Sequence, residues 1–152
     1  MDSMELKITP PTMTMITVLV MLLFSLLWPS SWPLWLRLFL SLLCILSGLV
    51  LTVLAWLPYH RTGTTWRPDD PEEVRNLLTE GVYQYSRNPM YLGLVLILVG
   101  WGCWLGSFAA FLPLPFFVYF LTRLQIVPEE RALEGHFNEG FRRYSARVRR
   151  WL

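Results

Sequence analysis

Side chains that can bind a polar ligand are concentrated in the segment from Leu78 to Gly93, which reads LTEGVYQYSRNPMYLG and leads directly into an apolar run. Three tyrosines and Arg87 supply hydrogen-bonding and stacking groups. Gly81, Asn88 and Pro89 are residues typical of turns. A chain does not need so polar a segment merely to turn around at a membrane boundary. We therefore predict that this segment forms one wall of a cofactor pocket.

The second wall is expected at two adjacent carboxylates, Glu129 and Glu130, which follow Pro128. Apolar residues recur after them at steps of three or four, which predicts one amphipathic helix over residues 128–151. The apolar stripe consists of Leu133, Phe137, Phe141, Tyr144, Val148 and Trp151. Most arginines of this segment lie off the stripe, which is typical of a helix in the cytoplasmic headgroup plane.

The elements that must position these residues are membrane helices. Only 16% of the 152 residues are charged, against about a quarter in soluble domains. Apolar runs at about 13–28, 34–57, 90–105 and 108–124 are close to the length that spans a bilayer. Proline follows the first two runs, at Pro29 and Pro58, and is expected to end them. The predicted fold class is all-α: a single-domain polytopic membrane protein with about four transmembrane helices and the C-terminal amphipathic helix.

Basic residues orient this chain in the membrane. Of 13 lysines and arginines, four lie between Arg61 and Arg87 and seven between Arg123 and Arg150. Because cytoplasmic segments carry the excess of basic residues, the loop 59–89 and the C-terminal segment should both be cytoplasmic. Both termini are then cytoplasmic, and a bacterial inner membrane is the expected location. This topology allows two polar segments that are far apart in the sequence to build one site.

Small residues predict where helices approach closely. The second run contains Ser41, Ser47, Gly48 and Thr52, and the tight hairpin of the third and fourth runs contains a GxxxG from Gly102 to Gly106.

Common soluble-enzyme motifs do not occur in this sequence. There is no GxGxxG after a strand, no Walker loop, no HExxH and no GxSxG in a strand–turn–helix context. His60 and His136 lack a partner at metal-ligand spacing, and Cys44 and Cys103 lie in apolar runs as small core residues. We expect no metal site, and the membrane context disfavours nucleic-acid binding.

Two motifs, taken in order, resemble a known family. The first is G-x-Y-x-Y-x-R-N-P-M-Y-x-G, from Gly81 to Gly93, and the second is E-E-R-x-L-x-x-x-F, from Glu129 to Phe137, with Tyr144 beyond. Separated by a helical hairpin, they resemble the integral-membrane methyltransferases typified by isoprenylcysteine carboxyl methyltransferase, which are related to the phospholipid N-methyltransferases. The resemblance covers roughly residue 60 to the end.

The resemblance implies S-adenosyl-L-methionine (SAM) as the cofactor, held at the cytoplasmic membrane edge, and a hydrophobic or lipid-linked acceptor. The residues it places at the cofactor are Leu77, Leu78, Tyr83, Asn88, Pro89, Met90, Tyr91 and Glu129. The candidate catalytic residues are Arg87, Tyr91 and Glu130. Gln125 stands where the family has an acceptor-binding arginine, so Gln125, Arg123 and Arg131 are the candidates for acceptor binding. Arg149 stands where the family usually has a proline.

The chemistry of such a reaction suits these residue types. A glutamate can hold the ammonium group of SAM, and an arginine or backbone N–H groups can hold its carboxylate. Tyr83, Tyr91 and Met90 offer an aromatic or apolar wall for adenine. Methyl transfer needs alignment and exclusion of water more than acid–base chemistry, so the lack of an obvious general base is compatible with it.

Two other functions stay open at this point. One is a membrane reductase that uses NADPH and is related to the sterol reductases, although this chain is much shorter than those. The other is a non-catalytic four-helix membrane protein; the absence of charged residues at mid-span disfavours a transporter. The acceptor group (carboxylate, thiol or amine) and the oligomeric state also stay open.

Overall fold

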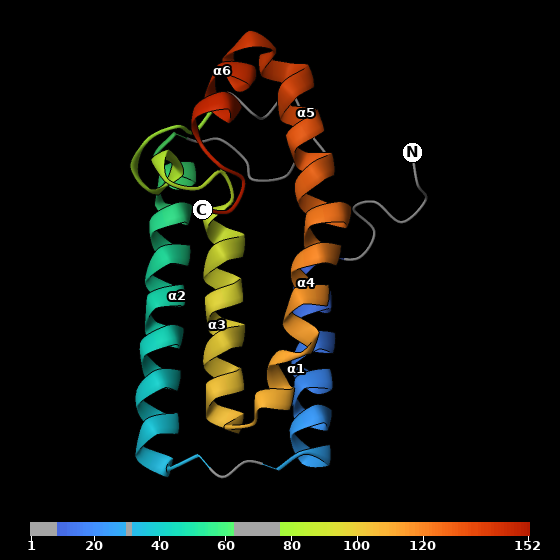
Figure 1. The fold of residues 1–152 in the computed structure, drawn as a ribbon. Coiled ribbons are helices and arrows are strands. Elements are labelled where there is room, and N and C mark those ends of the chain that lie inside the picture. The colour runs from blue at the N-terminus through green and yellow to red at the C-terminus, as the bar shows by residue number, and fades with distance from the viewer. Residues whose placement is uncertain (1–8, 30–31, 63–76) are drawn as a thin grey trace.

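The computed structural model of the protein describes residues 9–29, 32–62 and 77–152, with the side chains of 59–62 left out. All regular elements within this part of the chain are helical, as expected (Figure 1). They are α1 (Pro10–Leu27), α2 (Leu34–Thr62), the 3₁₀ helix η1 (Gly81–Gln84), α3 (Pro89–Leu105), the 3₁₀ helix η2 (Phe108–Phe111), α4 (Pro113–Leu121), the π-helical turn η3 (Thr122–Ile126), α5 (Val127–Phe137) and α6 (Glu139–Arg147). The central part of the expected cofactor loop, residues 63–76, lies outside the described residues.

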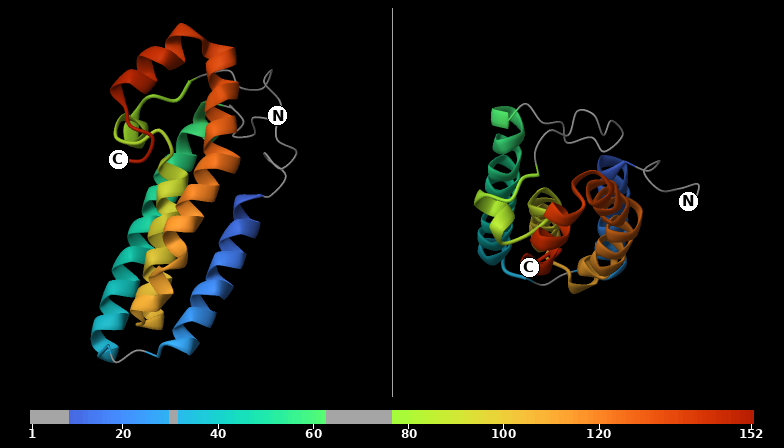
Figure 2. Two further views of the ribbon diagram at one scale, coloured as in Figure 1. Left: turned by 45° about the vertical axis from the view of Figure 1, so that its right-hand side comes forward. Right: turned by 90° about the horizontal axis from the view of Figure 1, so that it is seen from above.

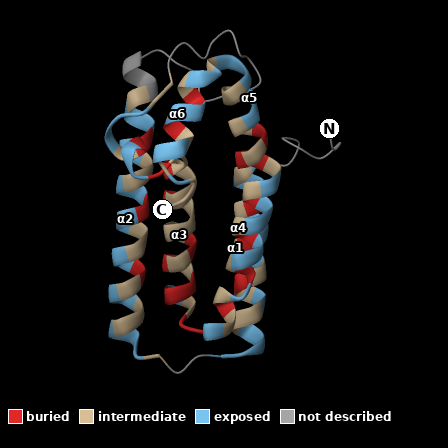
Figure 3. Ribbon diagram, turned by 45° about the horizontal axis from the view of Figure 1, so that its top comes forward, coloured by how far each residue is buried: buried red, intermediate tan, exposed pale blue. Residues whose placement is uncertain are grey.

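Three stretches are long and apolar enough to cross a membrane: Pro10–Leu27, Leu34–Pro58 and Phe108–Phe137. The fourth, α3, is also apolar but has only 17 residues. Large apolar side chains are exposed along the outer faces of these helices, above all on α2 (Figure 3). A soluble protein rarely exposes so much contiguous apolar surface, so these faces are lipid-facing.

Prolines begin three of the helices, because proline suits the first helical turn. They stand at Pro10 in α1, Pro89 in α3 and Pro113 in α4. In contrast to the sequence-based boundary, α2 does not end at Pro58 but continues to Thr62. Pro58 lies four residues before the end of α2, where the helix lacks the hydrogen bond that a Pro58 N–H would donate.

Helices α2 and α3 pack closely along a line of small residues. A side chain added at Gly93 would lie 2.7 Å from the backbone oxygen of Gly48, and one at Gly100 would lie 3.0 Å from that of Ser41. The GxxxG glycines serve other purposes. Gly102 makes room for the ring of Phe111, and Gly106 ends α3 in the left-handed conformation.

Helices α1, α3 and α4 share one apolar core. Its buried members are Met13, Met21, Leu98, Phe117 and Leu121, from α1, α3 and α4. Figure 2 shows α1 beside α4 on one side of the molecule, and α2 beside α3 on the other. Both connections that follow the core helices, at residues 106–107 and 32–33, lie at the end of the bundle opposite α6 (Figure 1).

The C-terminal part differs from the single amphipathic helix expected over 128–151. Helix α4 passes through the π-helical turn into α5 without a break, and the chain then reverses at Asn138 into α6. Asn138 has φ 43°, a conformation that asparagine tolerates better than most residues. The reversal folds α6 back toward η1 (Figure 2). Phe141 and Tyr144 of α6 are buried, and the Tyr144 hydroxyl contacts Tyr83 of η1.

Candidate functional site

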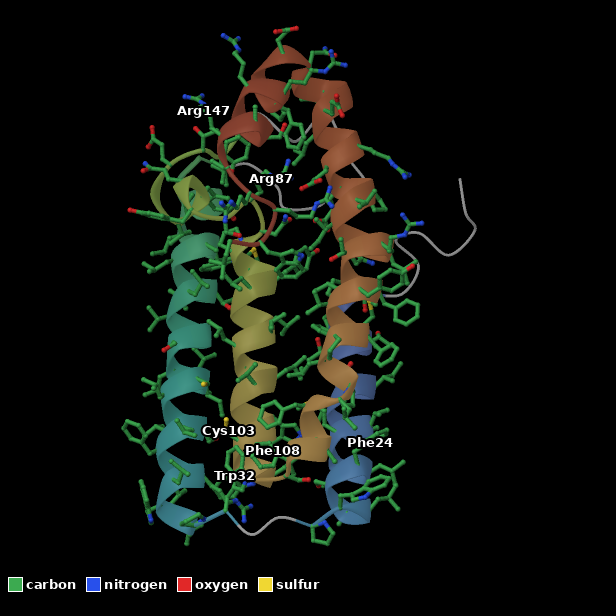
Figure 4. All side chains as sticks on the ribbon, in the orientation of Figure 1. Phe24, Trp32, Arg87, Cys103, Phe108 and Arg147 are labelled. Carbon is green, nitrogen blue, oxygen red and sulfur yellow. The ribbon has the colours of Figure 1, made fainter. Side chains whose placement is uncertain are left out.

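The loop that precedes α3 is held in place by η1 and by its own polar side chains. Gly81 begins η1 with φ 61°, and Tyr83 is buried with its hydroxyl donating to the backbone oxygen of Ala55 on α2. The Asn88 backbone N–H donates to the buried hydroxyl of Ser86. This arrangement delivers Arg87 to the end of α3 that faces α5 and α6 (Figure 4).

Tyr91 and Glu129, which lie 38 residues apart in the sequence, are in direct contact. The Tyr91 hydroxyl, in the first turn of α3, donates a hydrogen bond of 2.5 Å to Glu129 Oε1, in the first turn of α5. Both side chains are half-buried. The structure thus brings together one residue from each of the two polar segments.

Glu130 lies between two arginines. The Arg150 guanidinium donates two hydrogen bonds to Glu130 Oε2, from Nε at 3.1 Å and from Nη2 at 2.6 Å. Arg87 Nη2 lies 3.3 Å from the other carboxylate oxygen, Oε1. The Arg87 and Glu130 side chains are 14% and 11% exposed. The hydrogen bond to Glu130 raises the pKa of the Arg150 guanidinium further above its already high value. Arg150 is therefore charged throughout the physiological range.

Arg87 retains an unused hydrogen-bond donor. Its Nε is buried and has no hydrogen-bond partner among the described residues. The contact group of Arg87, Arg150 and Glu130 carries two positive charges and one negative charge, so it has a surplus positive charge. A buried guanidinium N–H of this kind is costly unless an acceptor reaches it. The arrangement can bind an anionic group.

Most of the other residues expected at the cofactor lie in the loop before α3 or at the start of α3. Leu77 and Leu78 precede η1 and are half-buried, Pro89 is buried as the first residue of α3, and Met90 follows it half-buried. Asn88 does not cap α3 with its side chain; its amide instead donates to the backbone oxygen of Arg150 at 3.1 Å.

The three candidates for acceptor binding have different environments. Gln125 is 4% exposed and lies within the π-helical turn, whereas Arg123 and Arg131 are exposed. A π-helical turn inserts one residue into the helix and is frequent at functional sites. Gln125 is therefore the candidate that the structure holds inside the bundle.

Sequence reasoning placed Trp151 only on an apolar stripe and assigned no site role to Arg150, Ser86 or Thr122, although all four make polar contacts beside these segments. The Trp151 indole N–H donates to the Thr122 hydroxyl at 3.3 Å. The only advance signal was the arginine cluster near the C-terminus, and it resembles a basic surface. The resemblance singled out only Arg149, which stands where the family usually has a proline, whereas in the structure Arg150 binds Glu130 and Arg149 is exposed.

Comparison with known proteins agrees with the resemblance. The chain is 46% identical over 63 residues to an uncharacterized protein of Haemophilus influenzae (strain ATCC 51907 / DSM 11121 / KW20 / Rd); the match covers 41% of this chain and 100% of that protein. No solved structure matches the chain significantly. The family model described as phospholipid methyltransferase matches residues 36–140, which include most of α2, all of α3, the residues between them and both glutamates. The chain therefore belongs to the phospholipid methyltransferase family.

Proposed function

We propose that this protein transfers a methyl group from SAM to a hydrophobic or lipid-linked acceptor at the cytoplasmic face of a membrane. The family implies membrane methyltransferase activity. The observation that best supports the finer proposal is the contact between Tyr91 and Glu129, because it joins the two polar segments at one end of a lipid-facing bundle.

The donor set at this end fits the polar part of SAM. That part is zwitterionic, with an ammonium group and a carboxylate. Glu129 supplies a carboxylate for the ammonium group, and the Tyr91 hydroxyl fixes the orientation of that carboxylate. Arg87, with its unpartnered Nε, supplies a donor for the cofactor carboxylate. When bound, SAM supplies a methyl group on a positively charged sulfur, which a nucleophile removes by in-line displacement.

The chain's own contribution is to orient and to enclose. Tyr91 and Glu129 meet at the first turns of α3 and α5. Two nearby residues in the sequence, Pro89 and Ile126, are fully buried. A water-soluble cofactor and a membrane-soluble acceptor can meet only at the membrane interface, and Arg87 of the polar network lies toward the end of the bundle that carries α6 (Figure 4). Alignment and exclusion of water therefore supply the rate, without a general base.

Orientation follows from charge. The exposed arginines of α5, α6 and the C-terminal residues lie at the site end of the bundle, and Arg147 marks that end in Figure 4. Phe24, Trp32 and Phe108 mark the opposite end. The excess of arginine at the site end supports a cytoplasmic site.

Calorimetry on the detergent-purified protein tests the proposal. We expect wild-type protein to bind SAM and not NADPH. Glu129→Gln should weaken SAM binding by about tenfold or more, because a charge-assisted contact is lost. Glu139→Gln is the matched control: it makes the same charge change on an exposed residue of α6.

Three outcomes would oppose the proposal. Binding of NADPH alone would favour a reductase, and binding of neither cofactor would favour a non-catalytic protein. Equal SAM affinity in Glu129→Gln and Glu139→Gln would show that Glu129 does not contact the cofactor. The acceptor is then sought by feeding methyl-labelled methionine to cells with and without the gene and comparing labelled lipids and small hydrophobic metabolites.

A further inference from the structure

The last residues of the chain are tied to three separate elements. The Arg149 backbone oxygen accepts a hydrogen bond of 3.0 Å from the Arg87 N–H, and the Arg150 backbone oxygen accepts one of 3.1 Å from the Asn88 side chain. Trp151 reaches in the other direction, to Thr122 in the π-helical turn. Residues 149–151, here called the C-terminal strap, therefore bridge the loop before α3 to the helix that carries both glutamates.

The Arg150 side chain adds a third connection, to Glu130. Its contacts with Glu130 are bidentate and short, at 2.6 Å to 3.2 Å, whereas Arg87 contacts the same carboxylate through one nitrogen at 3.3 Å. Bidentate pairing of a guanidinium with a carboxylate is the stronger and more directional arrangement. Arg150 is therefore the main partner of Glu130, and Arg87 is the weaker partner.

This division has a consequence for Arg87. If Arg150 were absent, Glu130 would be left with Arg87 as its counter-charge, and the two would form a neutral pair. The Arg87 guanidinium would then turn its donors toward Glu130. With Arg150 in place, Arg87 keeps a buried Nε without a partner among the described residues. The strap thus leaves the loop arginine available to a ligand.

We propose that Arg150 is a positioning residue, and that the C-terminal strap is a third wall of the site. Arg150 neutralises Glu130 so that Arg87 can direct its unused donor toward an anionic group of the bound molecule. Where that molecule is named as SAM, the inference rests on the proposed function. The strap itself rests only on the contacts of residues 149–151.

Arg150 and Arg149 provide a matched pair of variants. Arg150→Gln removes the partner of Glu130, whereas Arg149→Gln makes the same charge change on an exposed neighbour and retains the backbone oxygen that accepts from Arg87. Arg150→Lys keeps the charge but loses the planar fork. The first readout is SAM affinity by calorimetry. The second is hydrogen–deuterium exchange of the peptide that covers residues 82–92, without any ligand.

We expect Arg150→Gln to raise the Kd for SAM by about tenfold or more and Arg149→Gln to leave it within about twofold, with Arg150→Lys between them. Exchange in residues 82–92 should increase on the order of tenfold in Arg150→Gln only, because the strap that accepts hydrogen bonds from Arg87 and Asn88 loses its side-chain connection to α5. All three detergent-purified variants should keep the wild-type elution volume, since the apolar core is untouched.

The two readouts separate this inference from the proposed function. If wild-type protein does not bind SAM, the proposed function fails, and the exchange comparison alone decides whether the strap holds the loop. Equal exchange and equal SAM affinity in Arg150→Gln and Arg149→Gln would overturn the inference. Increased exchange with unchanged SAM affinity would overturn the positioning role of Arg150 and leave the strap as a purely structural element.

Discussion

Tyr144 of α6 donates a hydrogen bond of 2.7 Å to the backbone oxygen of Tyr83 in η1, and the Tyr83 hydroxyl in turn donates to Ala55 of α2 at 3.0 Å. Both tyrosines are almost fully buried, at 6% and 5% exposure. Two hydrogen bonds thus connect three elements that are distant in the sequence. The sequence-based expectation placed Tyr83 at the cofactor; in the structure its hydroxyl is used to hold the loop against α2.

Removal of the Tyr144 hydroxyl should therefore loosen the fold rather than the chemistry. We expect Tyr144→Phe to lower the free energy of unfolding by about 1 kcal/mol or more, because a buried hydrogen bond is lost. Thermal unfolding in detergent measures the change. Tyr85→Phe is the control, since the Tyr85 side chain is 76% exposed. Equal melting temperatures for the two variants would show that the Tyr144 contact is not stabilising.

Substitution by alanine should change the free energy of unfolding in opposite directions at two glycines. Gly106 has φ 66°, and an added Cβ would lie 2.7 Å from Cδ of Arg37, so Gly106→Ala should destabilise by about 1–2 kcal/mol or more. Gly135 lies within α5 and an added Cβ there meets no atom within 4 Å, so Gly135→Ala should stabilise by up to about 1 kcal/mol. The same thermal assay compares both, and a stabilising Gly106→Ala would contradict the turn geometry.

Gly93→Ala tests the close packing of α2 on α3. The new methyl group would lie 2.7 Å from the backbone oxygen of Gly48, and backbone cannot move aside as a flexible side chain can. We expect a loss of about 1–3 kcal/mol, typical of overpacking. Gly140→Ala is the control, because its nearest contact would be 4.0 Å away. An unfolding temperature for Gly93→Ala equal to that of this control would mean that the helices can separate at little cost.

Arg87→Ala and Asn88→Ala should impair cofactor binding without preventing membrane insertion. Arg87→Ala removes the unused donor, and we expect SAM affinity to fall by about tenfold or more. Asn88→Ala removes only a neutral hydrogen bond to the C-terminal strap, so a smaller loss, of about threefold to tenfold, is expected.

Calorimetry and membrane fractionation together measure these two effects. Gln84→Ala, an exposed change in the same loop, should leave both unchanged. If Arg87→Ala and Asn88→Ala bind SAM as wild-type protein does, these loop residues do not belong to the site.

Sequence alone determined the class of the protein. Hydropathy is a local property, so the apolar runs predicted a helical membrane protein, and the runs expected at 13–28, 34–57 and 90–105 begin within a few residues of the starts of α1, α2 and α3. The motif around Arg87 and the pair Glu129–Glu130 were also visible, and they carried the resemblance to the family that the comparison then showed.

Only the tertiary structure decided which of these side chains pair. The π-helical turn at Thr122–Ile126 adds a residue to the helix and so rotates everything after it by roughly 100° relative to a regular α-helix, which no hydrophobic period reports. The reversal at Asn138 includes a residue with positive φ, and after it the chain returns far enough for Arg150 to contact Glu130. Periodicity describes the faces of separate helices, whereas a contact between helices depends on where the chain bends between them.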